Sequence, residues 1–341
     1  MKKDSRLVYA ALGMIRHPSK ALNALKCAMF RSYKRTQLSY LPYVLDIEPT
    51  TYCNFKCQMC HVSDPDFKHQ HMSFDLFKKI IDENPQLIKI KLQGMGEPLL
   101  CPDFFKMAEY ARKKGVLVQT TTNGSMLIEE NIQKLIHAKL TSIGVSLDGA
   151  SAETFEGIRG GSNFNKVVAG VGELAKALKQ AGSKTVLRAW TVVQKKNIHE
   201  AEQIVGLAAQ LGFDAIVFQT HLSNWGKQAW SDKMDGITAE NSTLNRQGLV
   251  EIGKKKGINV SFYQGDVYSK QKPCIWPWHT AYVSADGFLV PCCILGDSSV
   301  KNFGNLNQQS IAVFWNSLEY SEFRAIHNSM RIPDYCMNCY R

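Results

Sequence analysis

Between residues 44 and 220, six short β-rich runs alternate with longer stretches of helical periodicity. Alternation of this kind indicates parallel strands joined by crossover helices. Six such units are too few to close an eight-stranded barrel, so the sequence predicts a partial (β/α)6 TIM-like barrel of the α/β class. The predicted strands are 43–48, 87–92, 116–121, 142–147, 185–192 and 215–219, and the predicted helices are 73–84, 102–114, 129–138, 164–182 and 198–211, with Ser73 and Asn197 as N-caps.

The regions on either side of the barrel differ from it in composition. Residues 221–272 are polar and rich in loop formers, which predicts an irregular connecting segment. Beyond them, Asp286-Gly287 favours a tight turn between strands at 280–283 and 288–290, followed by a helix near 310–327. The predicted organisation is therefore an N-terminal segment 1–43, a barrel 44–220, a connection 221–272 and a small C-terminal α+β domain 273–341.

Charge and hydropathy limit where the protein acts. The chain has 341 residues and a net charge of +11, much of it in residues 1–43, where lysines and arginines alternate with apolar residues. This basic amphipathic pattern predicts a helix that packs on the barrel, with peripheral contact to a membrane or an anionic partner as the alternative. We find no apolar run long enough to span a bilayer and no signal peptide, so we expect a cytoplasmic protein, and we expect no nucleic-acid partner.

Ten cysteines need an explanation, because disulfides are rare in the reducing cytosol and metal ligation is the usual alternative. One group follows the first predicted strand, and the other lies in the last 70 or so residues. Two metal sites are the simplest interpretation. The first group is Cys53, Cys57 and Cys60, the second is Cys274, Cys292, Cys336 and Cys339, and Cys27, Cys101 and Cys293 belong to neither.

The first group places three thiols on one loop. A [4Fe–4S] cluster offers one position per iron, so three thiolates leave one iron open to another ligand. A structural zinc site would need a fourth ligand, and His61, directly after Cys60, is the available alternative.

The C-x3-C-x2-C spacing after a first strand resembles the signature of the radical S-adenosylmethionine (SAM) superfamily. The resemblance implies that SAM chelates the open iron and that a reduced cluster cleaves it to a 5′-deoxyadenosyl radical, which abstracts a substrate hydrogen. It also implies an electron donor such as flavodoxin or ferredoxin.

Three later loops, each at the carboxyl end of a predicted strand, resemble SAM-contacting segments of the same family. Residues 93–98 are similar to its Gly-Gly-Glu-Pro segment, although Met95 interrupts the glycine pair. The resemblance assigns a backbone contact with adenine to Met59 and assigns SAM or substrate contacts to Gly96, Glu97, Thr122, Asn123, Ser146, Arg159 and Arg188.

The second cysteine group resembles the shortened SPASM or "twitch" extension of radical SAM enzymes. That resemblance implies one auxiliary [4Fe–4S] cluster held by Cys274, Cys292, Cys336 and Cys339. Structural zinc on the same four thiolates is the alternative.

A saturated cluster beside a radical site could accept an electron, so we expect dehydrogenation of a small polar substrate such as a sugar or aminocyclitol. Carbohydrate epimerisation, with Cys293 or Cys101 as the hydrogen donor, is one alternative, and peptide modification by a SPASM maturase is another. Outside enzymes, a zinc-stabilised binding protein for acidic partners would use the same cysteines and charge. Candidate substrate contacts are Trp190, Gln219, His221, Asn224 and Trp225.

Overall fold

The computed structural model describes residues 18–30, 35–240, 243–263, 268–269 and 274–340. Helix α2 (Pro18–Phe30) accounts for part of the predicted N-terminal helix, and residues 1–17 of that basic segment lie outside the described residues. Within the described part of the chain, no helix has the length and apolar character needed to cross a bilayer.

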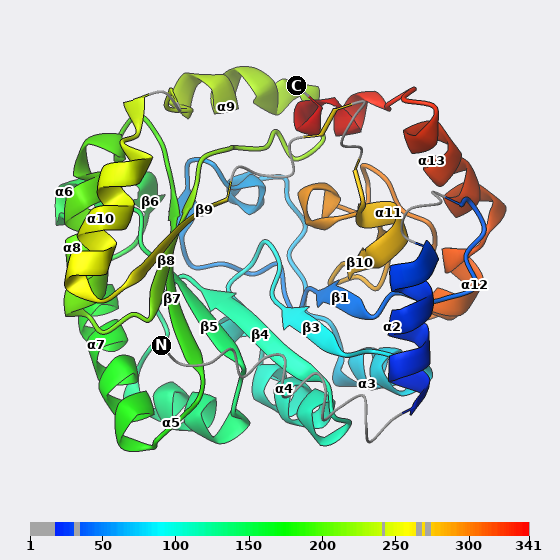
Figure 1. The fold of residues 1–341 in the computed structure, drawn as a ribbon, viewed down its shortest axis with the longest axis horizontal. Coiled ribbons are helices and arrows are strands. Elements are labelled where there is room, and N and C mark those ends of the chain that lie inside the picture. Colours follow the sequence, from blue (N-terminus) through cyan, green and yellow to red (C-terminus); the bar gives the residue numbers. More distant parts are fainter. Residues whose placement is uncertain (1–17, 31–34, 241–242, 264–267, 270–273, 341) are drawn as a thin grey trace.

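A single curved sheet of nine strands organises the molecule (Figure 1). Seven strands, from β1 to β9 in the order below, run parallel, which confirms a barrel-like α/β fold. All six predicted strands are present. The order is β11 (Leu289–Val290), β10 (Thr280–Val283), β1 (Val44–Ile47), β3 (Lys89–Leu92), β4 (Leu117–Thr122), β5 (Ser142–Ser146), β7 (Val186–Val192), β8 (Ala215–Gln219) and β9 (Asn259–Tyr263).

Helices cover the outer face of this sheet, with α4, α5, α7, α8 and α10 lying along its outside in Figure 1. Apolar side chains such as Leu45, Ile90 and Ile143 alternate along the strands and form the core beneath these helices. The helices in this layer are α3 (Phe74–Glu83), α4 (Phe104–Lys113), α5 (Glu129–Ala138), α6 (Ala152–Ile158), α7 (Phe164–Gln180), α8 (Ala201–Gln210) and α10 (Arg246–Lys256).

The two predicted N-caps have different outcomes. Ser73 caps α3 as expected, its hydroxyl accepting a hydrogen bond from Leu76 N at 3.2 Å. Asn197 makes no capping bond. Its side-chain amide instead donates to the carbonyls of Asp148 and Val192. Buried carbonyl groups require a hydrogen-bond donor, and the Asn197 amide supplies it to both.

The prediction that residues 221–272 form an irregular connection is wrong for much of this segment. It contains α9 (Ser231–Ile237), α10 and strand β9, which pairs in parallel with β8. The polar composition concealed these elements because α10 and β9 lie at the exposed edge of the sheet, where half of each element faces solvent.

The C-terminal hairpin is confirmed, with Gly287 at a φ of +86° in the turn between β10 and β11. Its position was not predicted: β10 pairs in parallel with β1, so the hairpin extends the main sheet. Helices α12 (Ile311–Trp315) and α13 (Leu318–Asn328) follow it and appear on the same side of the molecule as α2 in Figure 1. This arrangement brings the C-terminal cysteines toward the strand that leads into the first cysteine loop.

Candidate metal and cofactor centre

The first three cysteines are held on the loop that leaves β1. Cys57 belongs to the short strand β2 (Lys56–Cys57), which pairs with β6 (Arg159–Gly160) across the top of the barrel. Cys57 is buried, and Cys53 and Cys60 are half-buried. Burial, followed by the neighbouring Cys57 and Cys53 thiols, raises the pKa of Cys60 to about 12. The structure therefore brings the three predicted thiols together in a setting that only a bound cation would make favourable for thiolates.

Each of these thiols has one polar partner from another part of the chain. Asn123 Nδ2 lies 3.8 Å from Cys53 Sγ, and Arg159 Nη1 lies 3.8 Å from Cys57 Sγ. Cys60 Sγ lies 3.9 Å from the Met95 carbonyl oxygen. N–H donors directed at thiolate sulfurs are a usual feature of iron–sulfur sites, because they stabilise the charge on the ligands.

The number of thiols on this loop distinguishes a cluster from zinc. Zinc takes four ligands around one ion, whereas a four-iron cluster takes one ligand at each iron, so three thiolates leave one iron open. The donor set fits the cluster. His61 Nε2 lies 2.9 Å from Lys227 Nζ, so this ring nitrogen is occupied by another contact.

Glu97 joins the loop after β3 to the loop after β4. Its carboxylate is buried and accepts hydrogen bonds from Thr122 Oγ1 at 2.6 Å, Asn123 N at 2.6 Å and Leu99 N at 3.1 Å. Burial raises the pKa of Glu97, and these donors oppose that effect. A buried carboxylate with spare acceptor capacity suits the ammonium contact implied for this residue.

Gly96 explains how closely the loops approach. A Cβ at this position would lie 2.4 Å from the Thr50 carbonyl oxygen, so only glycine allows this loop to pack against the start of the cysteine loop. Ser146 ends β5, beside the same group of loops, and is buried. The predicted SAM-contacting segments therefore meet at the carboxyl ends of β1, β3, β4 and β5, where barrel active sites are built.

The two candidate arginines occupy different levels of the barrel. Arg159 is buried at the site, where Nη2 lies 2.7 Å from Asp148 Oδ2. Arg188 donates from Nη1 to Ser142 Oγ at 3.0 Å. Ser142 begins β5 and Ser146 ends it, so the Arg188 guanidinium points toward the opposite end of the strand from the site. A role in SAM binding stays a prediction for both.

Met59 and the spare cysteines also have defined surroundings. Met59 is buried, and its carbonyl accepts a hydrogen bond from Trp225 Nε1 at 3.0 Å. Cys101 is a core residue whose pKa burial raises to about 11. Cys293 is half-buried, directly beside Cys292, and its charge contributes to the raised pKa values of Cys292 and Tyr282. Of the two predicted hydrogen donors, Cys293 is the one near a metal site.

The second cysteine group lines one cavity, which confirms that the fold assembles these four distant thiols. Burial and then the neighbouring cysteines raise the pKa of Cys292 well above its usual range. The same cavity reaches the ends of β8 and β9 through Gln219, His221 and Tyr263. Tyr268, His327, Tyr335 and Tyr340 also line it, and nothing in their local sequence pattern distinguished them.

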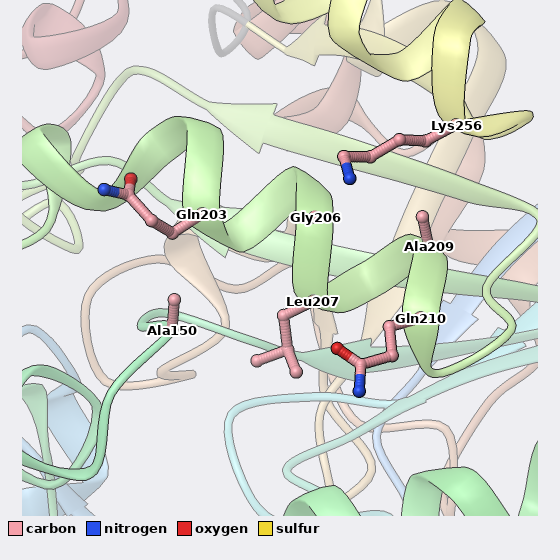
Figure 2. A pocket seen from close by; sticks show the side chains of 7 residues that line it. All are labelled: Ala150, Gln203, Gly206, Leu207, Ala209, Gln210 and Lys256. Carbon is pink, nitrogen blue, oxygen red and sulfur yellow. The ribbon is translucent and has the colours of Figure 1, made fainter.

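A second depression lies on the outer face of α8 (Figure 2). Its described lining residues include no thiol, carboxylate or imidazole, and Lys256 from α10 is its one charged side chain. It offers no ligands for the chemistry of the cysteine sites.

Sequence comparison matches two parts of the chain to known protein families. Residues 47–208 match the radical SAM superfamily, and residues 274–340 match the SPASM iron–sulfur cluster-binding domain. An AdoMet-dependent heme synthase of Methanosarcina barkeri is 27% identical over 322 residues, 87% of this chain and 88% of that protein. A PqqA peptide cyclase of Gluconobacter oxydans is 24% identical over 316 residues, 88% and 83% of the two chains. A mycofactocin maturase of Mycolicibacterium smegmatis is 30% identical over 238 residues, 64% and 59% of the two chains.

Solved structures share the fold. SuiB of Streptococcus suis bound to its precursor peptide SuiA matches with a TM-score of 0.69 and 15% identity, over 89% of this chain and 71% of that chain. BtrN in complex with AdoMet and 2-DOIA matches with a TM-score of 0.56 and 19% identity, over 88% and 94%. The shared architecture therefore includes both the barrel and the C-terminal extension.

Proposed function

Because this chain belongs to the radical SAM superfamily and carries a C-terminal SPASM iron–sulfur domain, we propose that it is a maturase that modifies a peptide. The observation that carries the proposal is the similarity to a PqqA peptide cyclase over 88% of this chain and 83% of that protein. The maturase similarity over residues of the barrel supports the same class of enzyme. This replaces our expectation of a sugar or aminocyclitol substrate as the leading hypothesis.

The cofactors of this chain are SAM and [4Fe–4S] clusters. Cys53, Cys57 and Cys60 would hold the SAM-binding cluster, and Glu97, Thr122, Asn123, Ser146 and Arg159 would contact SAM. Cys274, Cys292, Cys336 and Cys339 would hold one auxiliary cluster. With SAM bound, the first cluster supplies a 5′-deoxyadenosyl radical that abstracts hydrogen from an unactivated C–H bond.

The residues of this chain orient that chemistry and protect it. Glu97 is fixed by three hydrogen bonds, so it can meet an ammonium group without first reorganising. The loop glycines allow close packing beside the cysteine loop, and the indole of Trp225 donates a hydrogen bond to the Met59 carbonyl of that loop. Four thiolates at the second site leave no open iron, which suits that site to electron transfer rather than substrate binding.

Oxidation of a small polar substrate is the second candidate. It is favoured by a hydrogen-bonded polar group at the mouth of the auxiliary-site cavity, where Trp190 Nε1 donates to Gln219 Oε1 at 3.0 Å and Gln219 Nε2 donates to the His221 carbonyl at 2.9 Å. Epimerisation is a variant of this second candidate, in which Cys293, near the same site, would donate the hydrogen atom. A flavodoxin or ferredoxin would supply the electron in either case.

The test uses the whole chain, reconstituted anaerobically with iron and sulfide and given SAM and dithionite. Synthetic peptides corresponding to the short reading frames beside the gene are compared with an aminocyclitol, in normal and deuterated water. We expect a peptide product with a changed mass, together with 5′-deoxyadenosine. Turnover of the aminocyclitol alone, lighter by two hydrogens, would establish the second candidate instead, and deuterium in an isomeric product would indicate epimerisation.

A further inference from the structure

Glu48 is a fully buried acid, 0% exposed, between β1 and the cysteine loop. It is the first residue after β1 and comes five residues before Cys53. A carboxylate removed from water in this way is tolerated only when hydrogen-bond donors satisfy it. The identity of those donors therefore shows what the residue does.

The two carboxylate oxygens accept hydrogen bonds from two different loops. Oε1 accepts from Met95 N at 2.7 Å, and Oε2 accepts from Ala285 N at 3.2 Å. Met95 lies in the SAM-contacting loop, and its carbonyl faces Cys60 Sγ. Ala285 lies in the β10–β11 turn, a few residues before Cys292. The Glu48 side chain thus joins a loop of the first cysteine site to a turn of the second. The two residues that it binds, Met95 and Ala285, are 190 residues apart in sequence.

Steric fit adds a second, independent observation. A Cβ at Gly94 would lie 2.3 Å from both Cγ and Oε1 of Glu48, so the loop can close on the carboxylate only with glycine there. Met95 interrupts the usual glycine pair without harm, because the contact uses its backbone N–H. Its side chain extends the other way, with Cε 3.4 Å from the position that a Cβ of Gly296 would take in the C-terminal segment.

Tyr282 continues the connection toward the auxiliary site. It is buried on β10, and after burial the nearby charges of Glu48 and then Cys293 are among the causes that raise its pKa. Its hydroxyl oxygen lies 3.3 Å from the position that a Cβ of Gly296 would take, and the Cys293 carbonyl oxygen lies 3.4 Å from the same position. The Tyr282 side chain therefore reaches the segment that follows Cys292.

We propose that Glu48 is a positioning residue that couples the two cysteine sites, holding the SAM-contacting loop and the auxiliary-site hairpin in one fixed arrangement. Filling of the auxiliary site then strengthens SAM binding, and SAM binding stabilises the filled auxiliary site to the same degree, because such coupling is reciprocal. The inference rests on the family assignment and not on the identity of the substrate.

Glu48→Gln tests this role because it keeps the size of the side chain and changes one acceptor to a donor. The new amide N–H2 faces a backbone N–H, so one of the two loops loses its partner. Asp46→Asn is the matched control. Asp46 is a buried carboxylate on the same strand, but its bond goes to Lys91 Nζ at 3.4 Å.

The readouts, made on the reconstituted whole chain, are iron content, anaerobic SAM affinity and the electron paramagnetic resonance (EPR) spectrum of the reduced protein with and without SAM. We expect Glu48→Gln to keep its iron, to bind SAM roughly tenfold more weakly, as the loss of one buried hydrogen bond implies, and to show a smaller spectral change on SAM addition. Cys336→Ala/Cys339→Ala should weaken SAM binding in the parent chain and have less effect in the Glu48→Gln background.

Gly94→Ala covers the case in which Glu48→Gln fails to fold. It leaves Glu48 in the sequence but displaces its carboxylate, so it should reproduce the SAM defect. Parent-like SAM affinity and spectra in both variants would overturn the proposal, as would an equal loss in Asp46→Asn or auxiliary-site effects that are identical in the two backgrounds. None of these readouts requires the substrate, so they are independent of the peptide assignment.

Discussion

At the scale of single residues, the buried acids of the site are set by competition between desolvation and hydrogen bonding. Burial raises the pKa of Glu48 to about 7, while the N–H groups of Met95 and Ala285 act in the opposite direction. Asp148 shows the same competition, with burial raising its pKa and Arg159 opposing the rise. Such groups respond measurably to pH and to the loss of one partner.

Glu48 should make stability fall as pH rises between about 4.5 and 7. In this range the folded chain keeps a proton that the unfolded chain releases, so unfolding becomes easier with increasing pH. Relative to Glu48→Gln, the parent chain should lose on the order of 3 kcal/mol across this range, since each pKa unit is worth about 1.4 kcal/mol. Thermal unfolding of both proteins from pH 5 to 8 measures the difference, and parallel curves would contradict the prediction.

Arg159→Met should make the reduction potential of the SAM-site cluster more negative, by tens of millivolts. The substitution removes a cation and an N–H group 3.8 Å from Cys57 Sγ, both of which stabilise the reduced cluster. A redox titration followed by EPR provides the measurement. The substitution also leaves Asp148 buried without its cation, so Asp148→Asn/Arg159→Met is the control. It should recover stability and the part of the potential that is due to net charge, but not the part due to the lost N–H donor. Full recovery of the parent potential would refute the role of that donor.

At the scale of elements, the segment after β8 is packed against other elements and differs from the irregular connection that the sequence predicted. It passes between the cysteine loop and the C-terminal segment, with Trp225 at a φ of +58°. A Cβ at Gly226 would lie 2.3 Å from Leu295 Cδ2, which shows how closely the segment packs there. Lys227 then contacts His61 Nε2 on one side and Asp297 Oδ2, at 2.8 Å, on the other. The segment is an interdomain contact rather than a simple linker.

Lys227→Met should therefore destabilise the protein by about 1 kcal/mol, because the largely buried Asp297 loses its cation. Lys301→Met is the matched control, since Lys301 pairs with the exposed Glu319 on the surface and such pairs contribute little. Chemical denaturation of the two variants provides the comparison. Equal effects would mean that the Lys227 contact is no stronger than a surface ion pair.

At the scale of the whole molecule, two separate sites on one sheet predict two separable iron contents. With one four-iron cluster at each site, the reconstituted chain should hold about eight irons. Cys336→Ala/Cys339→Ala should reduce this to about four and keep the spectral response at saturating SAM, although more SAM is needed to reach it. Cys53→Ala/Cys57→Ala/Cys60→Ala should also leave about four irons but abolish that response. Iron analysis with EPR measures both, and a colourless protein containing zinc would contradict the cluster assignment.

Much of this organisation was predictable because the signals are local. The six central strands are short β-rich runs separated by helical stretches, and Ser73 caps α3 through a bond three residues away. The spacing of Cys53, Cys57 and Cys60 lies within one loop, so its chemistry could be inferred from the sequence itself. The Asp286-Gly287 turn was likewise predictable from its own dihedral preference.

Other features depend on contacts between distant residues and exist only in the folded chain. Nothing near Glu48 in the sequence indicates that its carboxylate meets Ala285, 237 residues later, or that β10 pairs with β1. Strand β9 was missed because it lies in a polar segment, although its own residues alternate between exposed and more buried positions. Asn197 does occupy the N-cap position of a short helix, but its side-chain amide donates to the carbonyls of Asp148 and Val192. The sequence by itself determined the barrel class and predicted the two cysteine groups as metal ligands. The tertiary structure decided how the two sites are joined, since burial and hydrogen bonding act between elements that only folding brings together.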